Sequence, residues 1–327
     1  MKLGRTQRRE GADKIMAKKE YFTFISSSKS TKIHGVRWVP ESGEYTAVLQ
    51  IVHGMTEYVE RYQEFADYMA EHGYLVVGHD HLGHGDSVKD PEDWGYIADE
   101  RGEQYMVADI NRVRKITEKE NPGLPYFILG HSMGSYLLRK YITRYGEGLS
   151  GAIIMGTGSV PDIATKTGMR VAECIALFKG WRHRSRLMES IFFSGSFRKF
   201  SMGREDPENN WLSKDLELVK RYYGEPKCSF HFTLNGFYNV MKVVYFDNQA
   251  KYTERIPKDL PIALLSGADD PVGDLGKGVK KVERQFKKAG IKDLYCKLYA
   301  NDRHEILNET DRDVVYFDIL SWCEKRK

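Results

Sequence analysis

The sequence predicts an α/β protein, with a mostly parallel β-sheet covered by helices on both faces and a helical cap inserted late in the chain. Short apolar runs alternate with long segments of helical period from residue 47 onward, and a parallel sheet needs such a helix between successive strands. This alternation stops for about a hundred residues between Gly156 and Pro261. A gap of that length is too long for a loop and contains helical patterns of its own, so it predicts the cap.

The composition is that of a globular protein and excludes several classes. Of the 327 residues, 41% are hydrophobic and 29% are charged, and the net charge of +4 is too small to predict a nucleic-acid partner. The four cysteines form no CxxC pair, which favours neither a metal knuckle nor a disulfide framework. No apolar run reaches the roughly 18 residues that a membrane span needs. These features predict a cytoplasmic protein.

The chain begins with a polar segment and a β-hairpin. Residues 1–19 hold seven Lys or Arg against Glu10 and Asp13 and show no periodicity, so we interpret them as a disordered basic tail. Within this tail, Met16 opens a stretch that is typical of a normal start. From Tyr21 to Trp38, two β-like stretches flank a Ser/Lys-rich turn, which predicts an antiparallel hairpin at a sheet edge.

The other core elements follow from hydrophobic pattern. Apolar runs predict six buried strands, at residues 47–52, 74–78, 126–130, 152–156, 261–267 and 294–299. Segments of helical period predict helices at residues 57–72, 101–119, 133–146, 274–289 and 311–325. Together these elements predict a core of residues 20–156 and 257–327, with the helical cap formed by residues 157–256.

A serine between two glycines is the first functional signal. The pentapeptide Gly-His-Ser-Met-Gly, at residues 130–134, joins a predicted strand directly to a predicted helix. A turn this tight strains its central residue, and side chains two positions before and after would collide with the strand and the helix. Ser132 is then held at the carboxyl end of the sheet, where it can act as a nucleophile. The alternative is a chance occurrence of the pattern in a turn.

A serine nucleophile needs a base to take its proton and an acid to orient that base. In this architecture both partners follow the serine in the chain, on loops after later strands. Asp269 and Asp270 both follow the strand at 261–267, and we favour Asp270, which directly precedes Pro-Val. Asp269 would then cap the loop or face solvent. His304 follows the last predicted strand, in a polar loop before a helical segment.

The oxyanion of an acyl-transfer intermediate needs two backbone N–H donors. One is expected from Met133, at the start of the helix that follows the serine. The other is expected from Met55, in the loop after the strand at 47–52, where Gly54 lets the chain turn. An ordinary strand-to-helix turn is the alternative interpretation of that loop.

Five motifs, in this order, resemble those of a known family. They are HGMTEYVERY at 53–62, DHLGHGDS at 80–87, GHSMGS at 130–135, GADDPVG at 267–273 and NDRHEILNE at 301–309. From about residue 20 to 325 the chain resembles the α/β-hydrolases of the monoglyceride lipase, lysophospholipase and serine aminopeptidase type. His81 is a small departure, since many relatives have a basic or other residue there. We interpret its loop as a structural turn with His84 packed inside.

The resemblance implies an α/β-hydrolase fold with no cofactor and no metal. It implies that Ser132 is the nucleophile, Asp270 the acid and His304 the base, with oxyanion donors at Met55 and Met133. The cap stretch at residues 211–233 also resembles the cap of bacterial lysophospholipases.

The predicted cap mixes basic and apolar side chains. Between residues 179 and 204, the single acidic residue is Glu189, against seven basic ones: Lys179, Arg182, Arg184, Arg186, Arg198, Lys199 and Arg204. Interleaved with them are Trp181, Leu187, Met188, Ile191, Phe192, Phe193 and Phe197. This mixture suits an acyl-chain groove near an anionic headgroup or lipid surface. The alternative is that the aromatic side chains form the core of the cap and the arginines a solvated face.

We therefore predict a serine hydrolase that cleaves lipid-like esters, such as a monoacylglycerol or a lysophospholipid, and that contacts a membrane surface transiently. Aminopeptidase relatives that release N-terminal proline keep a Gly-Gly-rich oxyanion loop and acidic cap residues, whereas this chain has His-Gly-Met at residues 53–55. Two alternatives are an amide hydrolase of the aminopeptidase type and a ligand-binding receptor on the same fold.

Overall fold

The computed structural model describes residues 17–203 and 205–327, and its centre is one eight-stranded sheet. The strands are β1 (Lys18–Ile25), β2 (Lys32–Val39), β3 (Ala47–Val52), β4 (Tyr74–His79), β5 (Tyr126–His131), β6 (Gly151–Met155), β7 (Ile262–Gly267) and β8 (Leu294–Tyr299). Their order is β1-β2-β4-β3-β5-β6-β7-β8. The pairs β1–β2 and β2–β4 are antiparallel, and the other neighbours are parallel. This is the α/β-hydrolase fold that the sequence predicts.

The hairpin lies at the sheet edge as predicted, but its first strand begins earlier. Lys18 and Lys19, assigned to the basic tail from the sequence, belong to β1, where they pair with Val39 and Trp38. The Lys19 ammonium also binds the Glu60 carboxylate at 3.0 Å. Paired lysines look like a tail in the sequence because their partners lie far along the chain. The rest of the predicted tail, residues 1–16, lies outside the described residues, as does Arg204.

Helices cover both faces of the sheet, because the strand side chains alternate between two apolar layers. In β3, Val48 and Val52 face one layer, and Leu49 and Ile51 face the other. The first layer is closed by α2 (Gly102–Glu120), α3 (Met133–Tyr145) and α9 (Lys277–Lys288). The second is closed by α1 (Gln63–Glu71), after the short 3-10 helix η1 (Val59–Tyr62), and by α10 (Arg312–Glu324). The five helices predicted for the core are therefore confirmed, with small shifts at their ends.

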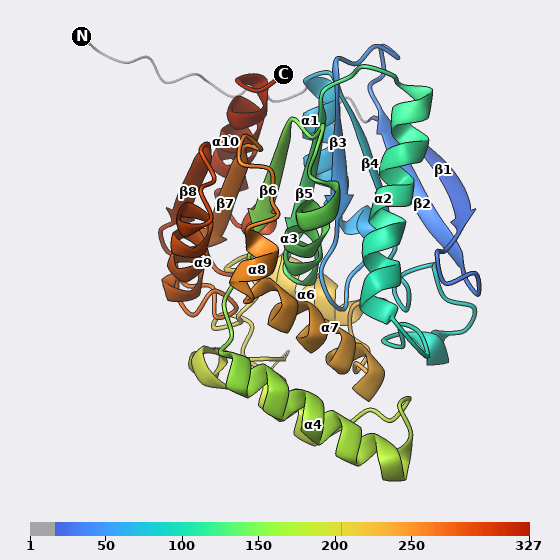
Figure 1. The fold of residues 1–327 in the computed structure, drawn as a ribbon, viewed down its shortest axis with the longest axis vertical. Helices are drawn as coiled ribbons and strands as arrows, with labels where there is room; N and C mark the ends of the chain where they lie inside the picture. Colours follow the sequence, from blue (N-terminus) through green and yellow to red (C-terminus); the bar gives the residue numbers. More distant parts are fainter. Residues whose placement is uncertain (1–16, 204) are drawn as a thin grey trace.

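The helical insertion lies between β6 and β7. It contains α4 (Asp162–Lys179), α5 (Arg186–Phe192), α6 (Leu216–Gly224), α7 (Leu234–Asp247) and α8 (Ala250–Thr253), with the 3-10 helix η3 (Gly195–Lys199). Helix α7 packs against α3 and α2 on one side and against α4 on the other. Helix α4 is therefore the outermost element, at the end of the molecule away from α10 (Figure 1). Two further 3-10 helices belong to the core, η2 (Pro91–Asp93) and η4 (Ile306–Asn308).

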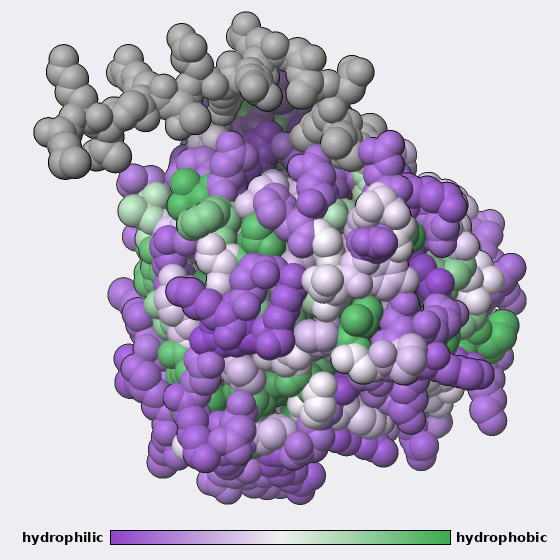
Figure 2. Space-filling view, turned by 90° about the horizontal axis from the view of Figure 1, so that it is seen from above, coloured by the Kyte–Doolittle hydropathy of each residue, from purple (hydrophilic) through white to green (hydrophobic). Residues whose placement is uncertain are grey.

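The two ends of the molecule differ in surface character. The end opposite α4 is mostly hydrophilic where it is visible, with apolar residues scattered over it (Figure 2). On α4, by contrast, the apolar side chains of Ile163, Leu177 and Phe178 are 77%, 82% and 87% exposed. No helix within the described ranges combines the length and apolar character needed to cross a bilayer.

Candidate active site

Ser132 lies in the turn between β5 and α3. Its φ of 53° and ψ of −120° form a conformation that non-glycine residues rarely adopt. A Cβ added at Gly130 would collide with the Gly134 carbonyl oxygen, and one added at Gly134 would collide with the Val52 carbonyl oxygen. Glycine is therefore required on both sides of the serine, which is the reason the sequence analysis gave for the pattern.

His304 and Asp270 form a buried pair beside this turn. The Nδ1 atom of His304 lies 3.0 Å from both carboxylate oxygens of Asp270, and the two side chains are 2% and 0% exposed. The Asp270 carboxylate also accepts the Val272 N–H at 2.9 Å and the Ser266 hydroxyl at 3.2 Å. These bonds fix the carboxylate, and the carboxylate orients the imidazole with its other nitrogen free to act as a base. Asp269, the alternative acid, is exposed.

The loop after β3 runs directly against the serine. A Cβ added at Gly54 would lie 3.0 Å from the Cβ of Ser132, so glycine permits this close approach. Met55, next in the loop, lines the same cavity as Ser132 and Met133. Because Met133 is the first residue of α3, its N–H has no acceptor inside the helix. The structure therefore places Met55, Ser132, Met133 and His304 around one cavity, with Asp270 bound to His304.

Glu57 is an important neighbour that the sequence analysis did not single out. Its buried carboxylate accepts hydrogen bonds from the Gly54 N–H and, at 2.9 Å, from the Tyr62 hydroxyl. It also contacts His131 Nδ1 at 3.1 Å and the Arg61 guanidinium at 2.8 Å. Burial alone would raise the pKa of Glu57, but the hydrogen bond and charge of His131, together with Arg61, hold it well below its usual value. A single ionised carboxylate thus links the loop after β3 to the serine turn.

Arg61 extends this network to the histidine loop. Its guanidinium binds the Glu305 carboxylate with two hydrogen bonds of 2.8 Å and lies 4.8 Å from the centre of the Tyr222 ring. His131 Nε2 lies 3.3 Å from the His304 carbonyl oxygen. The only sequence signal was the presence of Glu57, Arg61 and Glu305 within the motifs that carry the resemblance.

A cavity with a volume of about 600 Å³ lies in front of Ser132, and we call it the first cavity. Core loops form one wall, with Met55, Ser132 and His304, and the insertion forms the other. The insertion contributes mainly apolar side chains: Ile163, Val171, Met188, Ile191, Phe192, Phe193, Phe197, Val240, Met241 and Val244. Of the seven apolar cap residues noted in the sequence, five line this cavity, whereas Trp181 packs against Tyr238 and Leu187 is 58% exposed.

Trp211 connects the insertion to His304. Its ring stacks on the His304 imidazole with ring centres 4.9 Å apart, and the His131 ring lies 4.7 Å from the same imidazole. The backbone N–H of His304 donates to the backbone carbonyl oxygen of Trp211 at 3.4 Å. The imidazole is thus held by packing as well as by Asp270.

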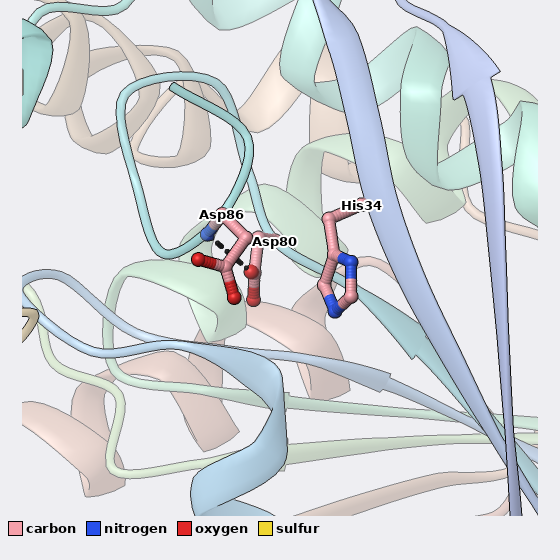
Figure 3. A group of neighbouring side chains, drawn as sticks. All are labelled: His34, Asp80 and Asp86. Atoms are coloured by element: carbon pink, nitrogen blue, oxygen red, sulfur yellow. Dashed lines mark hydrogen bonds between the residues drawn. The ribbon is translucent and has the colours of Figure 1, made fainter. Parts of the chain in front are cut away.

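The DxxGHGxS loop is a structural turn. The Asp80 carboxylate accepts the N–H groups of Val59 and Asp86, both at 2.8 Å, and burial raises its pKa to about 6. His84 is fully buried, and its Nδ1 atom lies 2.9 Å from the Leu82 carbonyl oxygen. Asp80, Asp86 and His34 lie close enough to hold a cation (Figure 3), but the Asp86 carboxylate already binds the Lys227 ammonium at 2.7 Å. The arrangement is accounted for by the turn itself.

Comparison with known proteins agrees with this geometry. Residues 43–311 match the family model described as serine aminopeptidase S33. The chain is 36% identical over 293 residues to a monoglyceride lipase of Rattus norvegicus, which covers 88% of this chain and 86% of the relative.

Solved structures show the same fold. A thermostable carboxyl esterase from Bacillus coagulans, solved with glycerol, is 27% identical, has a TM-score of 0.85 and covers 94% of this chain and 98% of its own. A soluble variant of a Saccharomyces cerevisiae monoglyceride lipase, solved with a substrate analogue, is 21% identical, has a TM-score of 0.74 and covers 99% of both chains.

The family match spans most of the chain, and Ser132, Asp270 and His304 follow one another in the chain order that is usual for the α/β-hydrolase fold. The chain therefore belongs to the serine aminopeptidase S33 family of α/β-hydrolases, together with the rat monoglyceride lipase.

Proposed function

We propose that the protein hydrolyses carboxylic esters of lipid-like substrates through an acyl-enzyme intermediate. The protein is a serine hydrolase of the esterase and lipase type. The observation that carries the proposal is the buried pair of Asp270 and His304, whose histidine lines the same cavity as the strained Ser132. The names of its relatives, monoglyceride lipase and carboxyl esterase, agree with this assignment.

The reaction begins when the Ser132 hydroxyl attacks the ester carbonyl and His304 Nε2 takes its proton. Asp270 accepts the Nδ1–H of His304 and stabilises the imidazolium that forms. The N–H groups of Met55 and Met133 stabilise the oxyanion, each contributing about 3 kcal/mol. The imidazolium then returns its proton to the leaving alcohol, and a water molecule, activated in the same way, releases the acid and restores the serine.

The first cavity suits an acyl chain. Its volume lies within the range of roughly 300–1,000 Å³ that is usual for small-molecule sites, and the insertion lines it with aliphatic and aromatic side chains. An aminopeptidase substrate would need an unpaired acidic group to hold its amine. Three acidic side chains line the cavity: Glu57 and Glu305 are buried and bind Arg61, and the exposed Asp274 accepts a hydrogen bond from the Ser196 hydroxyl. An ester with a monoacyl chain, as in a monoacylglycerol or lysophospholipid, is the better fit.

A substrate of this kind collects at lipid surfaces, and α4 presents a matching face. Ile163, Leu177 and Phe178 expose large apolar side chains on the outermost helix. We include in the proposal a transient contact of α4 with the lipid surface, driven by these side chains. Flotation with phosphatidylcholine vesicles tests it: Phe178→Glu should reduce the bound fraction, and binding unchanged by the substitution would contradict it.

Replacement of Ser132 by Ala tests the chemistry. Against p-nitrophenyl esters from acetyl to palmitoyl, Ser132→Ala should reduce turnover at least about a thousandfold, because the attacking oxygen is removed. Ser150→Ala, at a position outside the cavity, serves as the matched control. A fluorophosphonate probe should label the wild type and not Ser132→Ala. An unlabelled wild-type protein without esterase activity would favour the receptor alternative.

A further inference from the structure

A second cavity, of about 700 Å³, shares part of its lining with the first. Six residues line both cavities: Met55, Thr56, Phe193, Ser194, Trp211 and Tyr222. These include the oxyanion loop and the tryptophan that stacks on His304. An ester bound at Ser132 has two substituents on its carboxyl group, an acyl chain and an alkoxy group. Two cavities that meet at the oxyanion loop can therefore receive one substituent each.

The two cavities differ in charge. The first is mainly apolar where the insertion lines it, whereas Arg186 and Arg198 extend from the insertion to line the second. One acidic residue, Glu189, lines the second cavity as well, and its carboxylate lies 3.1 Å from His231 Nδ1. The negative charge in this wall therefore already has a partner within it.

The two arginines are available to a ligand. Neither guanidinium has a hydrogen-bond or ion-pair partner among residues 17–203 and 205–327, and both side chains are exposed. Their neighbours in the sequence are engaged elsewhere. Arg182 binds the Asp93 carboxylate at 2.6 Å, and Arg184 donates to the carbonyl groups of His231, Glu92 and Trp94 at 3.0 Å. Among the arginines that the structure describes between residues 179 and 203, the two without a partner are thus the two that line the second cavity.

We propose that the second cavity binds the phosphate-bearing headgroup of a monoacyl ester, while the acyl chain occupies the first cavity. A guanidinium offers planar, paired N–H donors that match the oxygens of a phosphate, and it keeps its charge at any physiological pH. Arg186 and Arg198 thereby select an anionic lysophospholipid over a neutral monoacylglycerol. This inference rests on the proposed ester hydrolysis at Ser132.

A matched pair of substrates tests the selection. We would measure dodecanoate release from 1-dodecanoylglycerol and from its 3-phosphate, below their critical micelle concentrations, for the wild type and for the double variant Arg186→Gln, Arg198→Gln. The ratio of kcat/KM for the phosphate ester to that for the neutral ester should fall at least about tenfold in the double variant, because charge-assisted hydrogen bonds are lost. A ratio unchanged from the wild type would overturn the proposal.

Arg170→Gln is the matched control. Arg170 is exposed on α4, pairs with Glu173 at 3.0 Å and lines neither cavity. The substitution removes one positive charge from the insertion without changing the lining of either cavity. An equal fall of the ratio in Arg170→Gln would mean a general electrostatic attraction and would count against a built subsite.

Binding of ether analogues separates this proposal from the proposed chemistry. 1-O-Dodecylglycerol and its 3-phosphate cannot be hydrolysed, so calorimetry reports the subsite even if no ester is turned over. The wild type should bind the phosphate ether more tightly than the neutral ether, and the double variant should lose that difference. Equal affinities in the wild type would overturn the subsite. Inorganic phosphate that binds as tightly as the phosphate ether would assign the arginines to a free anion and would also overturn the headgroup assignment.

Discussion

The two walls of the first cavity are built on opposite principles. The wall made by the core loops is buried and polar. Glu57 and His304 line it and Asp270 binds His304, and all three side chains are at most 3% exposed and have hydrogen-bond partners. The wall made by the insertion is apolar and open to solvent at its rim, where Ile163 and Ile191 are 77% and 38% exposed. In the core wall, a displaced atom leaves a buried charge without a partner, whereas the insertion wall can change shape at little cost.

This difference assigns a different task to each wall. In the proposed mechanism, acyl transfer needs donors and a base held to within a fraction of an ångström, and bonds between distant loops fix the side chains of the core wall in this way. Selection among acyl chains needs only volume and apolar contact, which the insertion provides. Substitutions in the core wall should therefore affect rate and stability, and substitutions in the insertion should affect substrate preference.

The largest effect is expected at the buried acid. Asp270→Asn removes the charge that stabilises the His304 imidazolium and changes the hydrogen-bonding partner of Nδ1, so kcat should fall about 10³- to 10⁴-fold while KM changes little. Steady-state kinetics on a short-chain ester measures this. Asp269→Asn, at the exposed neighbouring position, is the matched control. A loss below tenfold for Asp270→Asn would assign the orienting role to another group.

The next effect is on stability. Arg61→Met leaves the Glu57 and Glu305 carboxylates buried without their guanidinium, which should lower the free energy of unfolding by about 3 to 5 kcal/mol. Urea unfolding measures the change. Arg170→Met, which breaks an exposed pair on α4, should cost less than about 1 kcal/mol. Equal costs for the two substitutions would mean that the buried ion pairs of Arg61 contribute no more to stability than an exposed pair does.

Acid should destabilise the core through its buried histidines. Burial lowers the pKa of His53 and His79 to about 3 and that of His84 to about 4. Below the unfolded value of about 6.5 the unfolded chain takes up protons that the folded one refuses. The contribution of these histidines to the free energy of unfolding is thus fully present above that pH. It is lost toward pH 4, by about 1.4 kcal/mol per pH unit for each histidine.

His131 acts in the opposite direction. Burial would lower its pKa, but the hydrogen bond that it donates to the Glu57 carboxylate raises it above its ordinary value, so its contribution is present in acid and is lost as the pH rises. Urea unfolding between pH 4.5 and 7 measures the net slope. His79→Phe removes one of the protons that the unfolded chain takes up, so the slope should become shallower by about 1.4 kcal/mol per pH unit. His72→Gln, at an exposed site, should leave the slope unchanged. Parallel slopes for all three proteins would contradict this reading.

The smallest effect should be confined to selectivity. Ala164 lies on α4, is exposed and lines the first cavity. Ala164→Trp should place an indole in the space for the acyl chain, and the ratio of kcat/KM for dodecanoyl to that for acetyl esters should fall about tenfold. That corresponds to about 1.4 kcal/mol of lost binding. A parallel loss for both esters would show that the insertion wall also acts on the chemistry.

The sequence predicted the parts of the molecule that depend on local pattern. The six parallel strands follow from apolar runs, and the serine turn follows from the steric demand for glycine at residues 130 and 134. It did not predict the network of Glu57, Arg61 and Glu305, because the bonds between Arg61 and Glu305 join residues 244 positions apart. Nor could it divide the cap side chains between the cavities, the solvent and the cap interior, since that depends on how α4, α5 and α7 pack.

The position of Trp211 limits which part of the insertion could be replaced by a foreign cap. Residues 210–213, in the middle of the insertion, contact the core loop that contains Arg303 and Glu305. There the Asn210 carbonyl accepts the Arg303 guanidinium, and the Leu212 carbonyl accepts the Glu305 N–H at 2.8 Å. The segment belongs to the insertion by sequence, yet it supports the base through Trp211. A chimaera that exchanges α4 and α5 can carry a foreign specificity, but one that also replaces residues 210–213 removes the support of its own catalytic histidine. The boundary for grafting a new cap therefore lies inside the insertion and not at its ends.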